Sequence, residues 1–352
     1  MEIRVYDPQL DLIGIIEEYA TLLWTRKLYE PGNFQMKLPL TDRNVQYLKR
    51  GNIISKTGSK EAGVIELIEK TDTPKEKTLK ISGRFLSSYM DRRVILGTKT
   101  ISGTSEVVMR KFLQAAAPIP LVELGPISGF TDRTQKQTTY KNLLTVETAL
   151  AKASGHGYRF RPDFTKKKIF FEVYDGLDKS INQFDRPRVI FSDEYSNLND
   201  VRSTESDVLY KNVAHIGGAG EGSDRVFVTI GDTESEGLER HEVFIDAKSI
   251  QKDEGMTDAQ YRQLLIDYGT EQMSTYKITS SFDSTVNPMI NFKYGIDYDL
   301  GDTVTVTKKS WDINQDLKIT EIMEEYAGGK MTVIPTFGNP LPGLDWGDIY
   351  EQ

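Results

Sequence analysis

Apolar residues recur at every second position along much of the chain, which is typical of short β-strands with one buried face. Residues 303–307 read Thr-Val-Thr-Val-Thr, so the valines would face a core and the threonines the opposite side. The same alternation marks two further strands, one carrying Val226, Val228 and Ile230 and the other carrying Ile169, Phe171 and Val173. These patterns predict a mainly β protein with a minor helical part.

Three segments instead show the spacing of an amphipathic helix. Thr104 can cap the first, and Gly155 is a C-cap candidate for the second. The third begins with Thr257 and Gln260, which have the spacing of a capping box. The apolar stripes are Val108, Phe112 and Leu113, then Leu143, Val146, Leu150 and Ala153, then Tyr261, Leu264, Leu265 and Tyr268. Stripes of this kind usually face a core.

A weak internal repeat is the main organisational feature. The first copy consists of a turn and strand at 51–55, a strand at 64–69 and a strand at 79–82. The second copy has the same order, with its turn and strand at 301–305 and its later strands at 318–324 and 331–334. Both copies contain Glu-apolar-apolar-Glu in the middle strand. Short strands can resemble one another by chance, so the repeat alone leaves two readings open. If it is real, it predicts two related β-barrel-like domains.

The repeat and the helices together predict a domain plan. We expect a first β-barrel domain at 1–95, and a second made of 201–235 and 276–337. An α+β region would comprise 96–200 and 236–275, and residues 338–352 would form a C-terminal arm. The stretch 335–346 is rich in proline, which lacks an amide donor, so we expect it to leave the sheet. Its Leu341, Leu344 and Trp346 would dock on a neighbouring subunit or fold back on the last barrel.

Composition narrows the possible functions. A chain of 352 residues exceeds the usual size of a single core, and its lack of cysteine excludes disulfides and thiol nucleophiles. The formal charge is −8, without a dense basic stretch, which argues against sequence-specific nucleic-acid binding. The start lacks the pattern of a signal peptide, and the apolar stretch near residues 115–122 is short and contains two prolines. We therefore expect that the protein is synthesised in the cytoplasm and does not insert into a membrane.

The candidate chemical motifs are incomplete. The glycine-rich residues 217–222 follow a strand but precede another strand, so they favour a hairpin over a phosphate-binding loop. Asp312, Asn314 and Asp316 have the spacing of a calcium loop, but its required glycine and final carboxylate are missing. Asp297, Asp299 and Asp302 fail similarly, and the run 166–168 reads as a solvated hairpin tip.

His156, His215 and His241 belong to no metal-binding spacing, and no nucleophile elbow is present. The sequence thus predicts a non-enzymatic protein with no catalytic, cofactor-binding or metal-ligating residues and no cofactors.

Several stretches, in their order along the chain, resemble the siphophage ReqiPepy-type tail protein family, which is related to phage tail and baseplate hub proteins. They are 24–39, 212–225, 240–247, 298–304, 318–321 and 335–338. The resemblance implies a homotrimeric hub in which two barrel-like domains per chain form a ring of six. Such a hub adapts the six-fold tail tube to three-fold tip structures and surrounds the channel for DNA and the tape-measure protein.

The implied partners are the distal tail protein, the tape-measure protein and a downstream tail-tip or receptor-binding protein. The implied location is the tip of the virion tail. Larger hub relatives carry a C-terminal lysin or receptor-binding extension, whereas this sequence ends fifteen residues after Phe337. The alternative function is a tail-associated protein that binds cell-wall glycan or degrades peptidoglycan, which would need converging carboxylates or an exposed aromatic platform.

Overall fold

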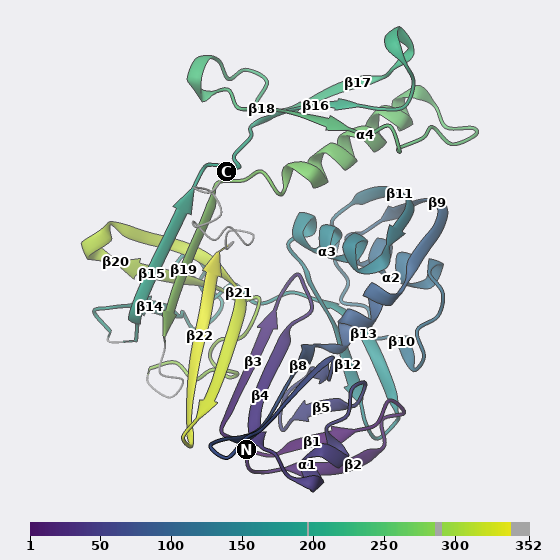
Figure 1. The fold of residues 1–352 in the computed structure, drawn as a ribbon. Coiled ribbons are helices and arrows are strands. Elements are labelled where there is room, and N and C mark those ends of the chain that lie inside the picture. Colours follow the sequence, from purple (N-terminus) through teal and green to yellow (C-terminus); the bar gives the residue numbers. More distant parts are fainter. Residues whose placement is uncertain (196, 286–290, 339–352) are drawn as a thin grey trace.

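A computed structural model describes residues 1–195, 197–285 and 291–338 (Figure 1). Strands make up 44% of the structure and helices 18%, so the prediction of a mainly β protein is confirmed. The predicted alternation at 303–307 forms β20 (Thr303–Lys308), in which Val304 and Val306 are fully buried. Thr305 is buried as well, and its hydroxyl is satisfied by donating a hydrogen bond to Asp316 at 2.6 Å.

One sheet of ten strands runs through both halves of the chain. Its path of neighbouring strands is β15 (Asn199–Ser206), β19 (Thr279–Thr285), β22 (Lys330–Gly338), β21 (Ile313–Ala327), β3 (Thr21–Lys27), β4 (Asn33–Pro39), β8 (Lys77–Arg84) and β7 (Leu67–Asp72). The other two members are β20, which pairs with β21, and β14 (Ile190–Ser192), which pairs with β20.

A four-stranded sheet packs on the N-terminal part of the large sheet. Its order is β2 (Leu12–Ile16), β1 (Ile3–Tyr6), β5 (Ile53–Lys56) and β6 (Ala62–Val64), and a short helix, α1 (Asp42–Tyr47), lies beside it. The core between the two layers contains Trp24, Phe34 and Phe85, all essentially unexposed. We call β1 to β8 the first β unit, and β14, β15 and β19 to β22 the second β unit.

The prediction of closed barrels is wrong for the described residues, because every sheet there is open and the large sheet ends at β7 and β15. Closure of the first β unit would require its end strands to pair with each other. The free side of β3 pairs instead with β21, so the two β units share one continuous sheet.

The three predicted helices are confirmed. They are α2 (Ser105–Ala115), α3 (Leu143–Ser154) and α4 (Asp258–Met273), and Thr104, Gly155 and the Thr257–Gln260 capping box lie at the expected ends. Gly155 has a φ of 78°, the left-handed conformation that favours glycine. Four short 3₁₀ turns are η1 (Leu86–Arg92), η2 (Gly222–Asp224), η3 (Gly237–Glu239) and η4 (Lys309–Trp311).

Residues 94–175 form what we call the α+β unit. Helices α2 and α3 pack against a ribbon of β9 (Val94–Gly103) and β11 (Thr134–Asn142) and a sheet of β10 (Val122–Leu124), β13 (Lys168–Tyr174) and β12 (Gly157–Asp163). The predicted strand residues Ile169, Phe171 and Val173 are buried in this core.

Residues 207–278, which connect β15 to β19 in the sequence, form what we call the inserted module. It consists of β17 (Phe227–Gly231), β16 (Val213–Gly217) and β18 (Glu242–Asp246), with α4 covering one face of the sheet. Its core is separate from the others and includes Ile216, Ile245 and Leu264. In Figure 1 the module lies at the end of the molecule opposite the N-terminus.

The two β units repeat one hydrogen-bond pattern. In the first, the turn at 51–52 makes two backbone bonds with Ile65, both 2.8 Å long. In the second, the turn at 301–302 makes the same two bonds with Ile319, at 2.9 and 2.8 Å. The antiparallel pairings around these points also match between the two units. They make β3 equivalent to β15, β4 to β19, β5 to β20, β6 and β7 together to β21, and β8 to β22.

This correspondence equates Ile65 with Ile319, so the Glu-apolar-apolar-Glu motifs of the two copies lie one residue out of step. The similarity of the strands therefore comes from the shared pairing pattern and not from that motif. The domain boundaries remain a prediction.

Candidate functional site

A cluster of buried charged groups lies where the two β units meet. Arg26 on β3, Lys56 on β5 and Glu324 on β21 are each less than one-tenth exposed. Because β3 pairs with β21, these side chains from distant parts of the sequence converge at the junction. Sequence reasoning did not single out these three residues, although a charge within the apolar run of β3 is an unusual feature.

Arg26 is the centre of the cluster. Its Nε donates to Oε2 of Glu61 at 3.1 Å, and its Nη1 donates to Oδ1 of Asp299 at 2.5 Å and to the hydroxyl of Tyr294 at 3.0 Å. Glu61 belongs to the first β unit, whereas Tyr294 and Asp299 come from the segment that precedes β20. The guanidinium therefore joins the two units.

A second cation completes the network. Lys56 pairs with Glu324, and its Nζ also donates to the hydroxyl of Tyr326 at 3.1 Å. Both Glu324 oxygens accept tyrosine hydroxyls, from Tyr294 at 2.9 Å and from Tyr326 at 2.5 Å. Tyr294 thus connects the arginine and lysine halves of the cluster.

Burial and charge act in opposite directions on these groups. Burial raises the pKa of Glu61 above its usual value, although Arg26 acts to lower it. Burial alone would also raise the pKa of Asp299, but the charge and hydrogen bond of Arg26 outweigh it and the pKa falls below its usual value. Burial lowers the pKa of Lys56, and Glu324 opposes that change. The cluster is stable only when its cations and carboxylates remain together.

The groups of this ion-pair network are suited to a structural role at the junction of the two β units. Its carboxylates and cations are engaged with one another, so no group of this network is positioned as an activated nucleophile or general base. Its consequence is mechanical, because it holds the two β units in one orientation.

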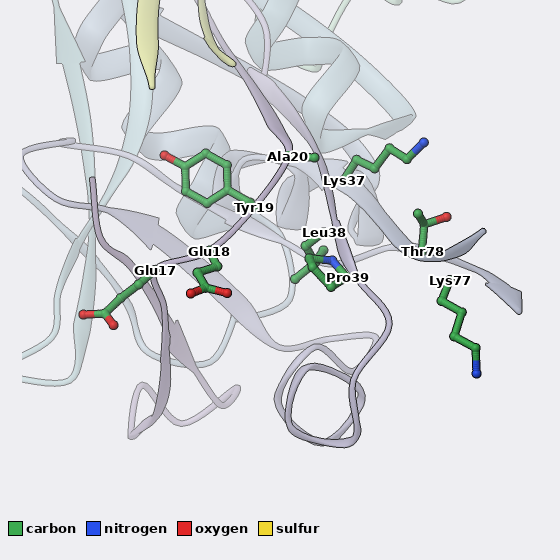
Figure 2. Close-up of a pocket in the computed structure, with 9 residues that line it drawn as sticks. All are labelled: Glu17, Glu18, Tyr19, Ala20, Lys37, Leu38, Pro39, Lys77 and Thr78. Atoms are coloured by element: carbon green, nitrogen blue, oxygen red, sulfur yellow. The ribbon is translucent and has the colours of Figure 1, made fainter. Parts of the chain in front are cut away.

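A surface groove lies at one end of β3, β4 and β8 and has a cavity volume of about 550 Å³ (Figure 2). It is lined by Glu17, Glu18, Tyr19, Ala20, Lys37, Leu38, Pro39, Lys77 and Thr78. Figure 2 shows the two glutamates on one side and the two lysines on the other. Lys37 also pairs with Glu76 at 2.9 Å. A broad groove with exposed charges of both signs differs from the enclosed, mostly apolar lining that is typical of a small-molecule site.

The glycine-rich residues 217–222 join two strands, as predicted. The return strand β17 starts at Phe227, after the turn η2. Arg225 folds back over the turn, and its guanidinium donates to the carbonyl oxygens of Gly218 and Gly217 at 2.9 and 2.8 Å. The arginine occupies the space above Gly217, where a Cβ would lie within 3 Å of the guanidinium.

Most of the side chains considered for calcium have other partners. Across the β20–β21 hairpin, Asn314 accepts from Thr307 and Asp316 accepts from Thr305. Asp316 also accepts from Asn182, which precedes β14. Asp302 accepts from Lys179 at 2.8 Å. Asp299 is the ion partner of Arg26 described above. Over the described ranges, the structure brings together no group of three histidine or acidic side chains suited to a metal ion.

The three histidines have separate partners, although His215 and His241 both lie in the inserted module. His156 stacks on Phe130, and its Nδ1 lies 3.2 Å from Asp175. His215 lies on the open face of β16, 3.2 Å from Glu242, and His241 contacts the ring of Tyr210. Each histidine has a local structural environment.

The run 166–168 is confirmed as the tip of the β12–β13 hairpin. Residues 335–338 correct a second expectation, because they belong to β22 and do not leave the sheet. The cross-strand pairs that join β22 to β19 involve only residues 336–338, so the missing amide of Pro335 removes no bond from that side. The arm residues Leu341, Leu344 and Trp346 lie outside the described residues.

Of the helices that the structure describes, none has both the length and the apolar character needed to cross a lipid bilayer.

Comparison with known proteins identifies relatives of the whole fold. A family model described as "Siphovirus ReqiPepy6 Gp37-like protein" matches residues 2–339. No curated protein gives a significant match. Solved structures with similar folds include the 43 kDa tail protein of prophage MuSo2 from Shewanella oneidensis, with 14% identity, a TM-score of 0.60, and coverage of 96% of this chain and 98% of that one.

Prophage tail protein gp18 from Listeria monocytogenes EGD-e has 14% identity and a TM-score of 0.57, with coverage of 100% of this chain and 98% of that one. The tail protein from Neisseria meningitidis MC58 has 10% identity and a TM-score of 0.56, with coverage of 96% and 95%. At these identities the similarity establishes a common fold.

Proposed function

Because the chain belongs to the Siphovirus ReqiPepy6 Gp37-like family of siphovirus tail proteins, we propose that it is a non-enzymatic hub at the tip of a phage tail. Three copies would form a ring that adapts the six-fold tail tube to three-fold tip structures. The channel of this ring would hold DNA and the tape-measure protein. The distal tail protein and a downstream tip or receptor-binding protein would be its neighbours.

The pairing of β3 with β21 is the observation that supports a ring most directly. It joins the first β unit to the second within one chain. By the correspondence of the two units, β15 is equivalent to β3 and β7 is equivalent to β21. These two equivalent strands are the free edges of the large sheet. The junction within the chain is therefore a template for pairing β15 of one subunit with β7 of the next.

The template specifies a register. Within the chain, Met323 lies opposite Thr25. Met323 corresponds to Glu69 and Thr25 corresponds to Thr204, so Glu69 of one subunit should lie opposite Thr204 of its neighbour. In that register Arg202 lies diagonal to Glu69, and Glu205 lies diagonal to Lys70. Opposite charges at such positions stabilise neighbouring strands modestly.

The number of strands fits a ring with a channel. Each chain contributes eight strands to the path from β15 to β7, so three chains contribute 24. At a spacing of about 4.8 Å, 24 strands have a perimeter of about 115 Å and a diameter of about 37 Å before strand tilt widens it. Barrels of 16 to 18 strands already leave an aqueous channel. A head-to-tail interface that closes by rotation also removes both exposed edges.

A disulfide cross-link tests the proposal. The chain has no cysteine, so only engineered pairs can react. We expect the variant with Glu69→Cys and Thr204→Cys to form interchain disulfides on oxidation and to sediment as three chains of 39.9 kDa. The matched control combines Glu69→Cys with Ser206→Cys, which is displaced by two residues on the same face and lies too far away for a disulfide. A monomer at every concentration, or equal cross-linking of both pairs, would refute the ring.

Glycan binding is a second candidate because the inserted module exposes two aromatic rings. Phe227 and Phe244 are 52% and 54% exposed, and the guanidinium of Arg225 lies 5.5 and 5.4 Å from their ring centres. Aromatic faces of this kind can stack against sugars. Sedimentation of the protein with purified peptidoglycan, and its loss on changing both phenylalanines to alanine, would support this function.

A further inference from the structure

Most of the net charge of the chain belongs to the inserted module. Residues 207–278 contain 14 acidic and seven basic side chains, whereas the α+β unit, residues 94–175, contains seven acidic and 12 basic ones. The two parts are thus of opposite charge. Opposite charge on two surfaces of one chain favours contact between copies of that chain when assembly brings those surfaces together.

The acidic charge is concentrated on a defined loop. Between β17 and β18, the side chains of Asp232, Glu234, Glu236 and Glu239 are exposed, and Leu238 among them is 95% exposed. We call residues 232–239 the acidic loop. An exposed leucine within four carboxylates has no stabilising contact in the isolated chain.

The acidic loop is held in one conformation by bonds to its backbone. Nη1 of Arg240 donates to the carbonyl oxygens of Thr233 and Ser235, both at 3.0 Å. Nδ2 of Asn212 donates to the carbonyl oxygen of Glu239 at 2.8 Å. A loop ordered before binding loses less conformational entropy when it binds.

The α+β unit carries a surface with complementary features. Leu96 and Tyr140, which are 65% and 68% exposed, lie at the irregularity where β9 and β11 shift register. The exposed Lys99 and Lys141 lie on the same two strands. This ribbon patch therefore combines an apolar centre with positive charge, as the acidic loop combines an apolar centre with negative charge.

The acidic loop and the ribbon patch lie on opposite sides of the molecule. In Figure 1 the loop between β17 and β18 lies above the β15 edge of the large sheet, whereas β9 and β11 lie on the other side. Within a single chain, the module contacts the α+β unit through α4 and the segment before it. Those contacts are polar, including Thr100 with Asp253 at 2.7 Å and Gln137 with Gln251 at 2.6 and 2.9 Å.

We propose that the acidic loop of one subunit docks on the ribbon patch of the next subunit around the ring. This inference rests on the proposed ring, because pairing β15 with β7 brings the acidic loop of one copy toward the α+β unit of its neighbour. Leu238 packs against Leu96 and Tyr140, and the carboxylates surround the lysines. This contact, which we call the clasp, is a second interface between subunits outside the sheet, and it fixes the direction of assembly.

Charge exchange tests the clasp. The acidic-loop variant carries Glu234→Lys, Glu236→Lys and Glu239→Lys, and the ribbon variant carries Lys99→Glu and Lys141→Glu. Sedimentation over a concentration series should show that each variant weakens trimer formation about tenfold, which is the size expected for several rim charges. Combining both sets should restore at least half of the loss, because the charges are again opposite. Leu238→Ala should weaken assembly about threefold while leaving the circular dichroism spectrum unchanged.

A matched control changes the same net charge elsewhere on the module, with Glu221→Lys, Asp224→Lys and Glu254→Lys. These side chains are exposed and lie outside the acidic loop. An equal effect of this control, or no rescue in the combined variant, would overturn the clasp.

The cysteine pair at Glu69 and Thr204 separates the two hypotheses. If that cross-link forms and the charge variants assemble normally, the ring stands and the clasp is wrong. If the unmodified chain stays monomeric and the cross-link fails, both are wrong.

Discussion

Replacing Arg26 with methionine tests whether the buried charge cluster holds the two β units together. The change removes the cation and keeps a side chain of similar length. Glu61, which is 3% exposed, then loses its ion partner, and Asp299 loses its shortest hydrogen bond. The remaining contacts of Lys56 with Glu324 do not reach Glu61.

The magnitude follows from burial. Removing one partner of a buried ion pair costs about 3–5 kcal/mol, because the other charge remains without compensation. The Asp299 side chain is 35% exposed and can regain water, so the lower end, about 3 kcal/mol, applies here. With a urea dependence of about 3 kcal/mol/M, the unfolding midpoint should fall by about 1 M.

Urea unfolding followed by tryptophan fluorescence measures this effect, since Trp24 is fully buried in the first β unit next to the cluster. The control is Lys27→Met on the adjacent position, where the side chain is 30% exposed and lies 3.5 Å from Glu321. That change should cost less than about 1 kcal/mol.

Adding Glu61→Gln to Arg26→Met removes the uncompensated charge and should recover part of the stability. A loss from Arg26→Met no larger than that of the control, or no recovery in the double variant, would refute the reasoning.

Four further predictions follow from other parts of the molecule. Burial raises the pKa of Glu147 well above 4.5, so its contribution to stability is present below that pH and is lost as the pH rises. Glu147→Gln should therefore raise the melting temperature at pH 8 relative to the unmodified chain and leave it nearly unchanged at pH 4, as measured by scanning calorimetry. Gly83→Ala places a Cβ 1.8 Å from the Val64 carbonyl oxygen and should destabilise the fold by about 3 kcal/mol in urea unfolding, whereas Ser82→Ala should not. Removing residues 339–352, which lie outside the described structure, should leave the melting temperature unchanged and weaken trimer formation or binding of the downstream tip protein in sedimentation and pull-down assays. The purified protein should show no turnover of peptidoglycan or ATP above a mock preparation; activity lost on changing one residue of this chain would contradict this.

Local features of the sequence were sufficient to predict three of the helices and several of the strands. The capping box at Thr257 and Gln260 and the glycine at 155 act within a few residues of themselves, so the ends of α4 and α3 could be located without tertiary information. The alternation at 303–307 has the same property, because a strand with one buried face needs period two wherever it lies.

Pairing between distant strands had to come from the tertiary structure. The expectation of two barrels failed because a strand pattern does not reveal which neighbour occupies each edge, and β3 pairs with β21 some 300 positions away. The same limit applies to Pro335, which the sequence indicated would leave the sheet. Its position in β22 removes no bond to β19, because the pairs with β19 end at residue 336.

For the candidate site too, some features could be predicted from the sequence and others were decided only by the tertiary structure. Composition and missing motifs favoured a structural protein, and the sequence by itself determined the helices, the hairpins and the repeated order of strands through contacts between near neighbours. Glu324 does not stand out in the sequence, because a charge on a strand is usually solvated, and the charge of Arg26 within an apolar run does not reveal which groups it will meet. Only the three-dimensional fold decided that they would be buried together at the junction, that β7 and β15 would remain as free edges, and that the acidic loop would lie on the β15 side. Each of these depends on which distant surfaces meet, and that choice is made by packing over the whole chain.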